Sequence, residues 1–159
     1  MNDITTFIFD VDGVLTDGKV HIAQNGELLR EMHIRDGFAM KAAIESGYNV
    51  CIISGGNNEG VRIRLKNLGI TDVHLASPDK VATFNEYVGS YNIKPEQVLY
   101  MGDDIPDIPV LRVAGLSACP QDAVSDVKAN VHYQSPYLGG KTCVRDLIEQ
   151  TLRCQDKWL

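Results

Sequence analysis

Short apolar runs alternate with segments of helical spacing along most of the chain, and this alternation predicts the fold. The first apolar run, residues 4–9, predicts a buried strand that stops abruptly at Asp10. Further strands are predicted at residues 48–53, 73–76, 98–101 and 116–119, with a last short one at 131–133. Helices are predicted at residues 36–46, 57–68, 78–91, 105–113, 122–129 and 142–154. This order predicts a three-layer α/β fold, with a doubly wound parallel sheet and right-handed crossovers.

Residues 18–34 interrupt this alternation and predict a projecting β-hairpin. Residues 19–23 alternate in polarity, Asn25-Gly26 is a strong turn signal, and the chain returns through residues 27–33. A lone two-stranded ribbon is marginal in water and has edges to protect. We therefore expect neighbouring subunits to cover the hairpin.

Composition and charge narrow the class of protein. The 159 residues contain no repeat and no linker, so we expect one domain over residues 1–159, ending in a helix and tail at about 141–159. A net charge of −6 without a basic patch argues against nucleic acid as a partner, and no apolar segment approaches the length of a membrane span. The four cysteines have no metal-site spacing, and no charged region precedes the first strand, so we expect a cytoplasmic protein.

Polar residues follow several of the predicted strands. Asp10 and Asp12 follow the first strand, Ser54 the second, Asp103 and Asp104 the fourth, and Lys80 comes just after the third. A lone Asp-x-Asp is usually a solvated turn, but the carboxyl ends of parallel strands share one edge, where ligands bind. Two close carboxylates repel each other unless a cation or a shared proton offsets their charge. These strand ends together therefore predict an active site.

The residue types suit phosphoryl transfer. The carboxylate of Asp10 can attack phosphorus to form an aspartyl-phosphate, and Asp12 is placed to protonate the leaving oxygen and later to deprotonate water. Mg²⁺ prefers one or two carboxylates together with water and phosphate oxygens, and Asp10 and Asp103 can supply the two carboxylates. Ser54 and Lys80 can hold the phosphoryl oxygens.

Four segments in order resemble the motifs of the haloacid dehalogenase superfamily: residues 10–17, residues 53–55, Lys80, and residues 102–107. The resemblance implies a Mg²⁺-dependent phosphotransferase with Asp10 as nucleophile and Asp12 as acid and base. It implies metal ligation by Asp10, Asp103 and the backbone carbonyl of Asp12, with Asp104 and Asp107 in the outer shell. The gaps between the motifs leave no room for a cap domain, so neighbouring subunits would have to exclude water.

The hairpin, the full length, and residues 34–37, 61–64 and 139–140 further resemble the 3-deoxy-D-manno-octulosonate 8-phosphate phosphatases. That family implies a role in lipopolysaccharide precursor synthesis and a homotetramer whose hairpins form a central barrel over neighbouring sites. A sister branch, which hydrolyses nine-carbon ulosonate 9-phosphates, tends to carry Glu and Lys where this chain has Gly56 and Asn67. The eight-carbon substrate is therefore favoured. A non-catalytic oligomeric binding module would tolerate loss of the acidic residues and the lysine, yet all are present.

Several residues are candidates for holding the substrate. Arg64 is favoured over Arg62 for a substrate carboxylate, Arg35 is equally suited to a surface ion pair, and Asp36 to a helix N-cap. The full set of predicted substrate-binding residues is Thr16, Asp17, Gly18, Arg35, Asp36, Gly37, Gly55 and Arg64.

Overall fold

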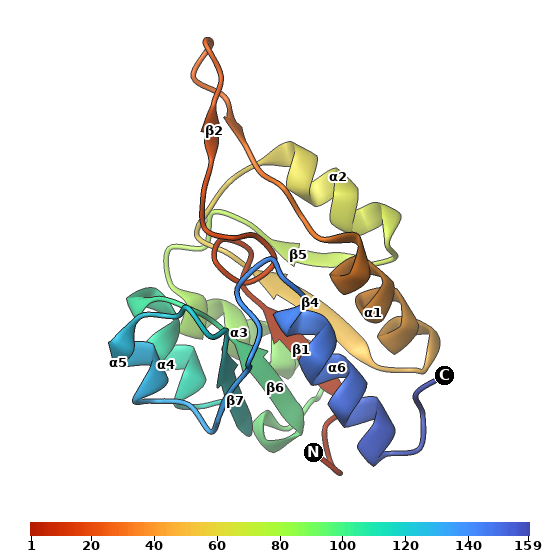
Figure 1. The fold of residues 1–159 in the computed structure, drawn as a ribbon. Helices are drawn as coiled ribbons and strands as arrows, with labels where there is room; N and C mark the ends of the chain where they lie inside the picture. The colour runs from red at the N-terminus through yellow and green to blue at the C-terminus, as the bar shows by residue number, and fades with distance from the viewer.

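A computed structural model describes residues 1–159 and confirms the α/β fold (Figure 1). The six strands of its sheet are all parallel, and their spatial order is β5-β4-β1-β6-β7-β8. In chain order the strands are β1 (Thr6–Phe9), β4 (Asn49–Ile53), β5 (Asp72–His74), β6 (Val98–Met101), β7 (Leu116–Cys119) and β8 (Tyr133–Gln134). The chain leaves β1 for β4 on one side and later returns to pair β6 on the other. The carboxyl end of β1 therefore lies at the switch point where such sheets bind ligands.

Helices cover both faces of the sheet and form the outer two layers. One face carries α1 (Ile34–Glu45), α2 (Glu59–Asn67) and α6 (Cys143–Cys154). The other carries α3 (Lys80–Ser90), α4 (Ile108–Leu111) and α5 (Ser125–Lys128). Two short 3₁₀ helices are also present, η1 (Pro95–Gln97) and η2 (Ile105–Asp107). None of the helices is long and apolar enough to cross a membrane.

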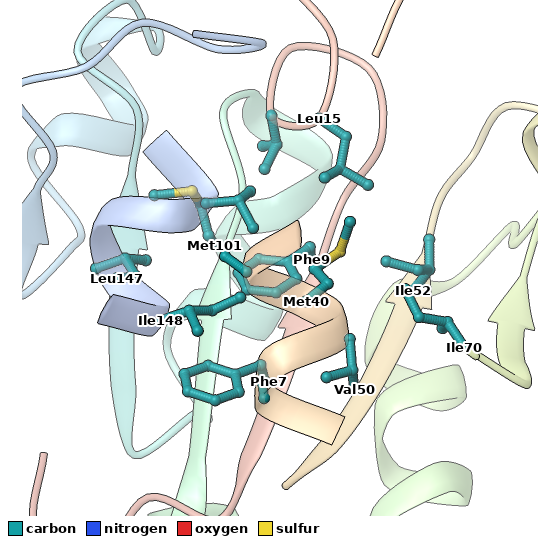
Figure 2. Packing of buried hydrophobic residues seen from close by; sticks show 14 of the residues in the cluster. Phe7, Phe9, Leu15, Met40, Val50, Ile52, Ile70, Met101, Leu147 and Ile148 are labelled. Carbon is teal, nitrogen blue, oxygen red and sulfur yellow. The ribbon is translucent and has the colours of Figure 1, made fainter. Parts of the chain in front are cut away.

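Successive side chains of β1 point to opposite faces of the sheet and pack into a different core cluster on each, as expected for a strand buried on both sides. Phe7 and Phe9 point into the cluster under α1 and α6, where Figure 2 shows them beside Met40 and Ile148. Ile8 points the other way, into the cluster under α3 and α4. The centre of β1 is thus held rigidly from both sides, which fixes the position of the residues that follow it.

Several predicted boundaries shift, and each shift has a local cause. Helix α1 begins at Ile34 rather than Asp36, because the His33 side chain caps it by accepting from the Arg35 backbone N–H at 3.1 Å. The single helix predicted over residues 105–113 is two elements, η2 and α4, each with a proline in its first two positions. Proline fits the first turn of a helix but interrupts its interior.

The hairpin is present but its ladder is short. Strands β2 (His21–Ile22) and β3 (Leu28–Leu29) pair antiparallel around a turn in which Gly26 has φ +84°. Figure 1 shows the ribbon projecting from the body of the molecule. Ile22 is 76% exposed and Leu29 48% exposed. The predicted longer strands do not form, and the apolar hairpin residues remain uncovered within one chain.

Candidate active site

Three acidic side chains and one lysine converge at the carboxyl edge of the sheet. Asp10 follows β1, Asp103 follows β6, Asp107 ends η2, and Lys80 is the first residue of α3. One oxygen from each of the three carboxylates lies within 4.8 Å of the others. They surround a pocket of about 270 Å³, which is lined by Asp10, Asp12, Gly18, Ser54, Gly55, Gly56, Lys80, Asp103, Asp104, Pro106 and Asp107. The structure thus brings the predicted strand-end residues together around one pocket.

Lys80 is the buried cation of this site. Its Nζ donates to Asp10 Oδ2 at 2.8 Å and to Asp107 Oδ1 at 2.7 Å. Burial alone would lower the pKa of Lys80, but the two carboxylates outweigh it and raise the pKa above its ordinary value. Lys80 therefore stays charged, and α3 holds it in place because Asp79 Oδ1 caps that helix.

Asp107 is a fully buried support for the loop after β6. Its Oδ1 accepts from Lys80 and from the Tyr100 hydroxyl at 2.6 Å. Its Oδ2 accepts from the backbone N–H groups of Asp103 at 3.0 Å and Asp104 at 3.2 Å. Gly102 is required here, because a side-chain carbon at that position would overlap Asp107. Asp107 thus positions both Asp103 and Lys80, while Asp104 is exposed and caps η2.

Burial raises the pKa values of two of these carboxylates, and repulsion among the carboxylates adds to the shift. Burial, followed by the charge of Asp107, raises the pKa of Asp10 to about 6, although Lys80 opposes the shift. Burial, followed by the charges of Asp10 and Asp107, raises the pKa of Asp103 to about 8. A divalent cation would offset this excess negative charge, and clustered carboxylate oxygens are the hard ligands that Mg²⁺ prefers. The donor set therefore fits the predicted magnesium cofactor.

Asp12 lies at the rim of the pocket and is held by an arginine from the hairpin. Arg30 Nε donates to Asp12 Oδ1 at 2.6 Å, and Arg30 Nη2 donates to Asp12 Oδ2 at 3.1 Å. This is a bidentate guanidinium–carboxylate pair, the strong form of such contacts. The prediction of site residues missed Arg30, since the returning arm of the hairpin carries no motif.

Ser54 and Gly56 line the pocket, and Gly13 makes room for Asp103 beside it. Ser54 is buried at the end of β4, and its Oγ accepts from the Gly56 backbone N–H at 3.3 Å, which leaves the hydroxyl proton to donate elsewhere. Gly13 has φ +84°, and a side-chain carbon there would overlap Asp103. The turn after β1 can therefore approach Asp103 only with glycine at this position.

Comparison with known proteins agrees with this geometry. The model of the haloacid dehalogenase-like hydrolase family matches residues 27–115. The 3-deoxy-D-manno-octulosonate 8-phosphate phosphatase KdsC of Yersinia pestis is 36% identical over 155 residues, which cover 98% of this chain and 83% of the relative. The chain belongs to the haloacid dehalogenase-like hydrolases.

Relatives of the KdsC type extend the match to the whole chain and to its fold. KdsC of Escherichia coli K12 is 36% identical, covering 98% of this chain and 82% of the relative. The crystal structure of the Yersinia pestis phosphatase has a TM-score of 0.96 at 35% identity, covering 98% of this chain and 84% of that one. The structure of the Moraxella catarrhalis phosphatase with magnesium, phosphate and KDO has a TM-score of 0.94 at 29% identity, covering 98% and 89%. The present chain is thus a capless haloacid dehalogenase-like enzyme.

Three residues of the turn after Asp12 were predicted to touch substrate, and only one of them lines the pocket of this hydrolase. Gly18 does so. Thr16 is buried, and its Oγ1 accepts from the backbone N–H groups of Gly13 and Gly18, both at 3.2 Å. Asp17 accepts from the Lys19 backbone N–H at 3.0 Å and lines a different cavity, together with Lys141. Thr16 therefore shapes the turn rather than the pocket surface.

The two arginines of α2 lie in different surroundings. Arg62 pairs with Glu59 at 3.4 Å and donates to the Val73 carbonyl at 2.9 Å, so it is structural. Arg64 lines a separate cavity of about 370 Å³ between α2 and the returning hairpin arm. A side-chain carbon at Gly37 would lie 3.0 Å from Arg64 Nη2, so Gly37 makes room for the guanidinium. Arg35 is exposed and lines a cavity beside α6, away from the catalytic pocket.

Asp36 lies neither at the N-cap of α1 nor in the pocket, the two positions predicted for it. It does not cap α1, because His33 does, and it is buried beneath α6 rather than facing the pocket. Its Oδ1 accepts from the Arg145 backbone N–H at 2.8 Å, so Asp36 supports the first turn of α6. The segment leading into α6 packs on the catalytic turn, where the Gly140 backbone N–H donates to the Val14 carbonyl at 2.9 Å. Asp36 therefore acts on the site only through the backbone.

Proposed function

We propose that this enzyme hydrolyses 3-deoxy-D-manno-octulosonate 8-phosphate to 3-deoxy-D-manno-octulosonate and inorganic phosphate, with Mg²⁺ as cofactor. The observation that carries the proposal is the buried Asp10–Lys80–Asp107 network beside Asp103, in a chain similar along nearly its whole length to phosphatases of that name. The reaction class follows from the geometry, and the substrate from the relatives.

The first step forms a covalent intermediate on Asp10. An oxygen of the Asp10 carboxylate attacks phosphorus, and the bond from phosphorus to the sugar oxygen breaks. Asp12 gives its proton to the departing oxygen, so the sugar leaves as an alcohol. Lys80 and the Ser54 hydroxyl hold the phosphoryl oxygens while the attacking and leaving oxygens stay in line.

The second step returns the enzyme to its starting state. Asp12 takes a proton from a water molecule, whose oxygen attacks phosphorus, and the bond from phosphorus to Asp10 breaks. Phosphate leaves, and Asp12 is again protonated. Both steps require Asp12 to reach an oxygen in the pocket, so its bidentate contact with Arg30 has to open.

The metal would be held by the carboxylates of Asp10 and Asp103 and by the backbone carbonyl of Asp12, with Asp104 and Asp107 outside the first shell. When bound, Mg²⁺ supplies positive charge that offsets the repulsion between an anionic nucleophile and an anionic phosphate. Burial, and then the charges of neighbouring carboxylates, raise the pKa values of Asp10 and Asp103, and a bound cation would favour the ionised forms of both.

Substrate recognition extends from the pocket to its rim. We assign the phosphate end to Gly18 and Gly55 beside the catalytic residues, and a substrate carboxylate to the cavity that holds Arg64. Gly56 and Asn67 favour the eight-carbon substrate, because the nine-carbon branch tends to carry Glu and Lys at these two positions. A nine-carbon ulosonate 9-phosphate is the alternative substrate.

Assembly and location complete the proposal. Val20, Ile22, Leu28 and Leu29 on the hairpin are exposed in one chain, which supports burial between subunits. We propose a cytoplasmic homotetramer in which neighbouring subunits cover the active site and exclude water. No nucleic acid or membrane is expected as a partner.

The test is phosphate release from a panel of eight- and nine-carbon ulosonate phosphates and simple sugar phosphates, each with Mg²⁺ and with a chelator. We expect kcat/KM to be highest for the eight-carbon substrate, and release to stop when the metal is removed. Equal kcat/KM across the panel would refute the substrate while keeping the reaction class. Undiminished release in the presence of the chelator would refute the magnesium dependence.

A further inference from the structure

Arg30 connects the catalytic pocket to the hairpin, and neither the proposed mechanism nor the sequence motifs assign it a role. Its guanidinium uses three nitrogens: Nε and Nη2 donate to Asp12, and Nη1 donates to the Leu28 carbonyl at 3.2 Å. The Arg30 side chain is only 8% exposed, whereas that of Asp12 is 36% exposed. Arg30 is therefore packed into the wall of the site rather than lying on its surface.

Two cavities meet at this wall. Arg30 lines the cavity of about 370 Å³ that also contains Arg64 and Asn58. Arg30 also borders a narrow space that it shares with Asp12 and Ser54, two residues of the catalytic pocket. A substrate whose phosphate lies in the catalytic pocket and whose other end enters the Arg64 cavity would have to pass Arg30.

The contact with Asp12 shows which chemistry Arg30 binds. Its guanidinium already binds a carboxylate in bidentate fashion, because it donates to both oxygens of Asp12. Asp12 cannot present either oxygen to a leaving group while this contact is closed. An incoming carboxylate has the same shape and charge, so the guanidinium can exchange one carboxylate for another and remain paired throughout.

We propose that Arg30 is a specificity-determining residue, which transfers its guanidinium from Asp12 to a carboxylate of the bound substrate. The released Asp12 carboxylate then takes up a proton from solvent and can turn toward the leaving oxygen. The proposal rests on the proposed function in one respect, namely that the substrate carries a carboxylate. It makes the substrate carboxylate a condition for efficient turnover rather than only a source of binding affinity.

Gly56 supports this arrangement from the other side. A side-chain carbon at position 56 would lie 2.9 Å from Asp12 Oδ2 and 3.3 Å from Arg30 Nη2. Gly56 has no positive φ that would require glycine, so the close approach of this pair accounts for its presence. An alanine at position 56 would displace the Asp12–Arg30 contact without touching Lys80 or Asp107.

The test compares a carboxylate substrate with the same molecule in which the carboxylate is masked. We would measure kcat/KM for 3-deoxy-D-manno-octulosonate 8-phosphate and for its methyl ester, with the wild type, Arg30→Gln, Arg30→Lys and Gly56→Ala. The matched control is Arg62→Gln, which removes an arginine of α2 that lies outside the pocket. Thermal unfolding of each variant checks that the fold is retained.

We expect the wild type and Arg62→Gln to prefer the acid over the ester by the same factor. In Arg30→Gln this preference should fall by about 10- to 100-fold, as expected for loss of a charged hydrogen-bonding partner. Arg30→Lys should keep part of the preference, and Gly56→Ala should reduce it. An acid-to-ester ratio in Arg30→Gln equal to that of the wild type would overturn the proposal, as would a wild type without preference.

These outcomes separate the proposal on Arg30 from the proposed function. The proposed function fails if other sugar phosphates are hydrolysed as efficiently as the eight-carbon acid. The role of Arg30 fails if the acid-to-ester ratio does not depend on Arg30, whichever sugar phosphate is preferred.

Discussion

The floor of the active site consists of Asp10, Lys80, Asp103 and Asp107, and its rim consists of Asp12 and Arg30. The two are held in place by different kinds of contact. On the floor, Lys80 bridges Asp10 and Asp107, and the Asp107 carboxylate has four donors from β6, the loop after it and α3. At the rim, the Asp12 side chain accepts hydrogen bonds only from Arg30. Arg30 lies on the returning arm of the hairpin, whose two strands have only two paired residues each. The floor is therefore held together by contacts within the body of one chain, whereas the rim depends on a segment that has no core of its own.

The largest effect should come from the floor. Asp10→Asn keeps the size of the side chain but replaces the carboxylate of the proposed nucleophile with an amide. We expect kcat to fall by about 10⁴-fold or more, as for other residues that act as nucleophile. Phosphate release under single-turnover conditions measures it. The control Asp126→Asn changes an exposed aspartate of α5, away from the pocket. An active Asp10→Asn enzyme would contradict the assignment of the nucleophile.

Lys80→Met tests whether the floor depends on its one buried cation. The substitution removes the only side-chain cation that contacts Asp10 and Asp107, and breaking a buried ion pair in this way costs about 3–5 kcal/mol. We expect the free energy of unfolding in urea to fall by about that amount in the metal-free protein, and Mg²⁺ to restore part of it. Lys66→Met, at an exposed position of α2, is the control. Unchanged stability of Lys80→Met would mean that the carboxylates are neutral in the folded state.

Ile22→Lys tests whether the rim is completed by other subunits. Ile22 is 76% exposed in one chain, so a lysine there should not disturb the folded subunit. It should place repelling charges where the hairpins are proposed to meet. We expect a lower mass by sedimentation equilibrium, together with a rise in KM and a nearly unchanged circular dichroism spectrum. Gln24→Lys at the hairpin turn is the control, and an unchanged mass of Ile22→Lys would remove the hairpin from the subunit interface.

The pH dependence of stability should report chiefly the two floor carboxylates whose pKa values are raised most. The pKa of Asp10 is raised to about 6 and that of Asp103 to about 8, chiefly by burial, so the folded state holds these protons more tightly than the unfolded state. Their stabilising contribution is complete below about pH 4 and is lost as the pH rises through 6 to 8. In a chelator, Tm should therefore fall by several degrees from pH 5 to pH 8.

Magnesium should reverse this trend, because the metal competes with the same protons. The rise in Tm caused by Mg²⁺ should be larger at pH 8 than at pH 5. Measuring Tm by calorimetry at both pH values, with metal and with chelator, checks both statements. A metal effect that does not vary with pH would mean that the ion binds away from Asp10 and Asp103.

The sequence predicted part of the floor, because Asp10 and Asp103 follow strands that can be recognised by their apolar runs, whereas the pairing of Asp107 with Lys80 was not predicted. Once the strands are parallel, Asp10, Ser54 and Asp103 have to meet at one edge. The rim could not be predicted in this way. Arg30 reaches Asp12 only because the hairpin arm folds back over the turn after β1, and no local pattern specifies that path.

Asp36 illustrates the same limit within the core. Its place in the chain, near the start of a helix, suggested an N-cap or a ligand contact, and the local pattern allowed both. The structure instead pairs it with the backbone of α6, more than a hundred residues further along the chain. Side chains that stabilise a distant backbone group cannot be told from local caps until the packing of the helices is known.

The smallest effect is expected at this residue, and it separates support from recognition. In Asp36→Ala the Arg145 backbone N–H loses its acceptor, so the free energy of unfolding should fall by about 1 kcal/mol, as for other lost helix caps. Asp36→Asn keeps an acceptor oxygen and buries no charge. Since burial already raises the pKa of Asp36, this variant should be nearly as stable as the wild type. We expect the free energy of unfolding in urea and kcat/KM to change together, and only slightly. A tenfold loss of kcat/KM in Asp36→Asn at unchanged stability would instead mean that Asp36 contacts the substrate. The substrate-binding surface would then extend into the core.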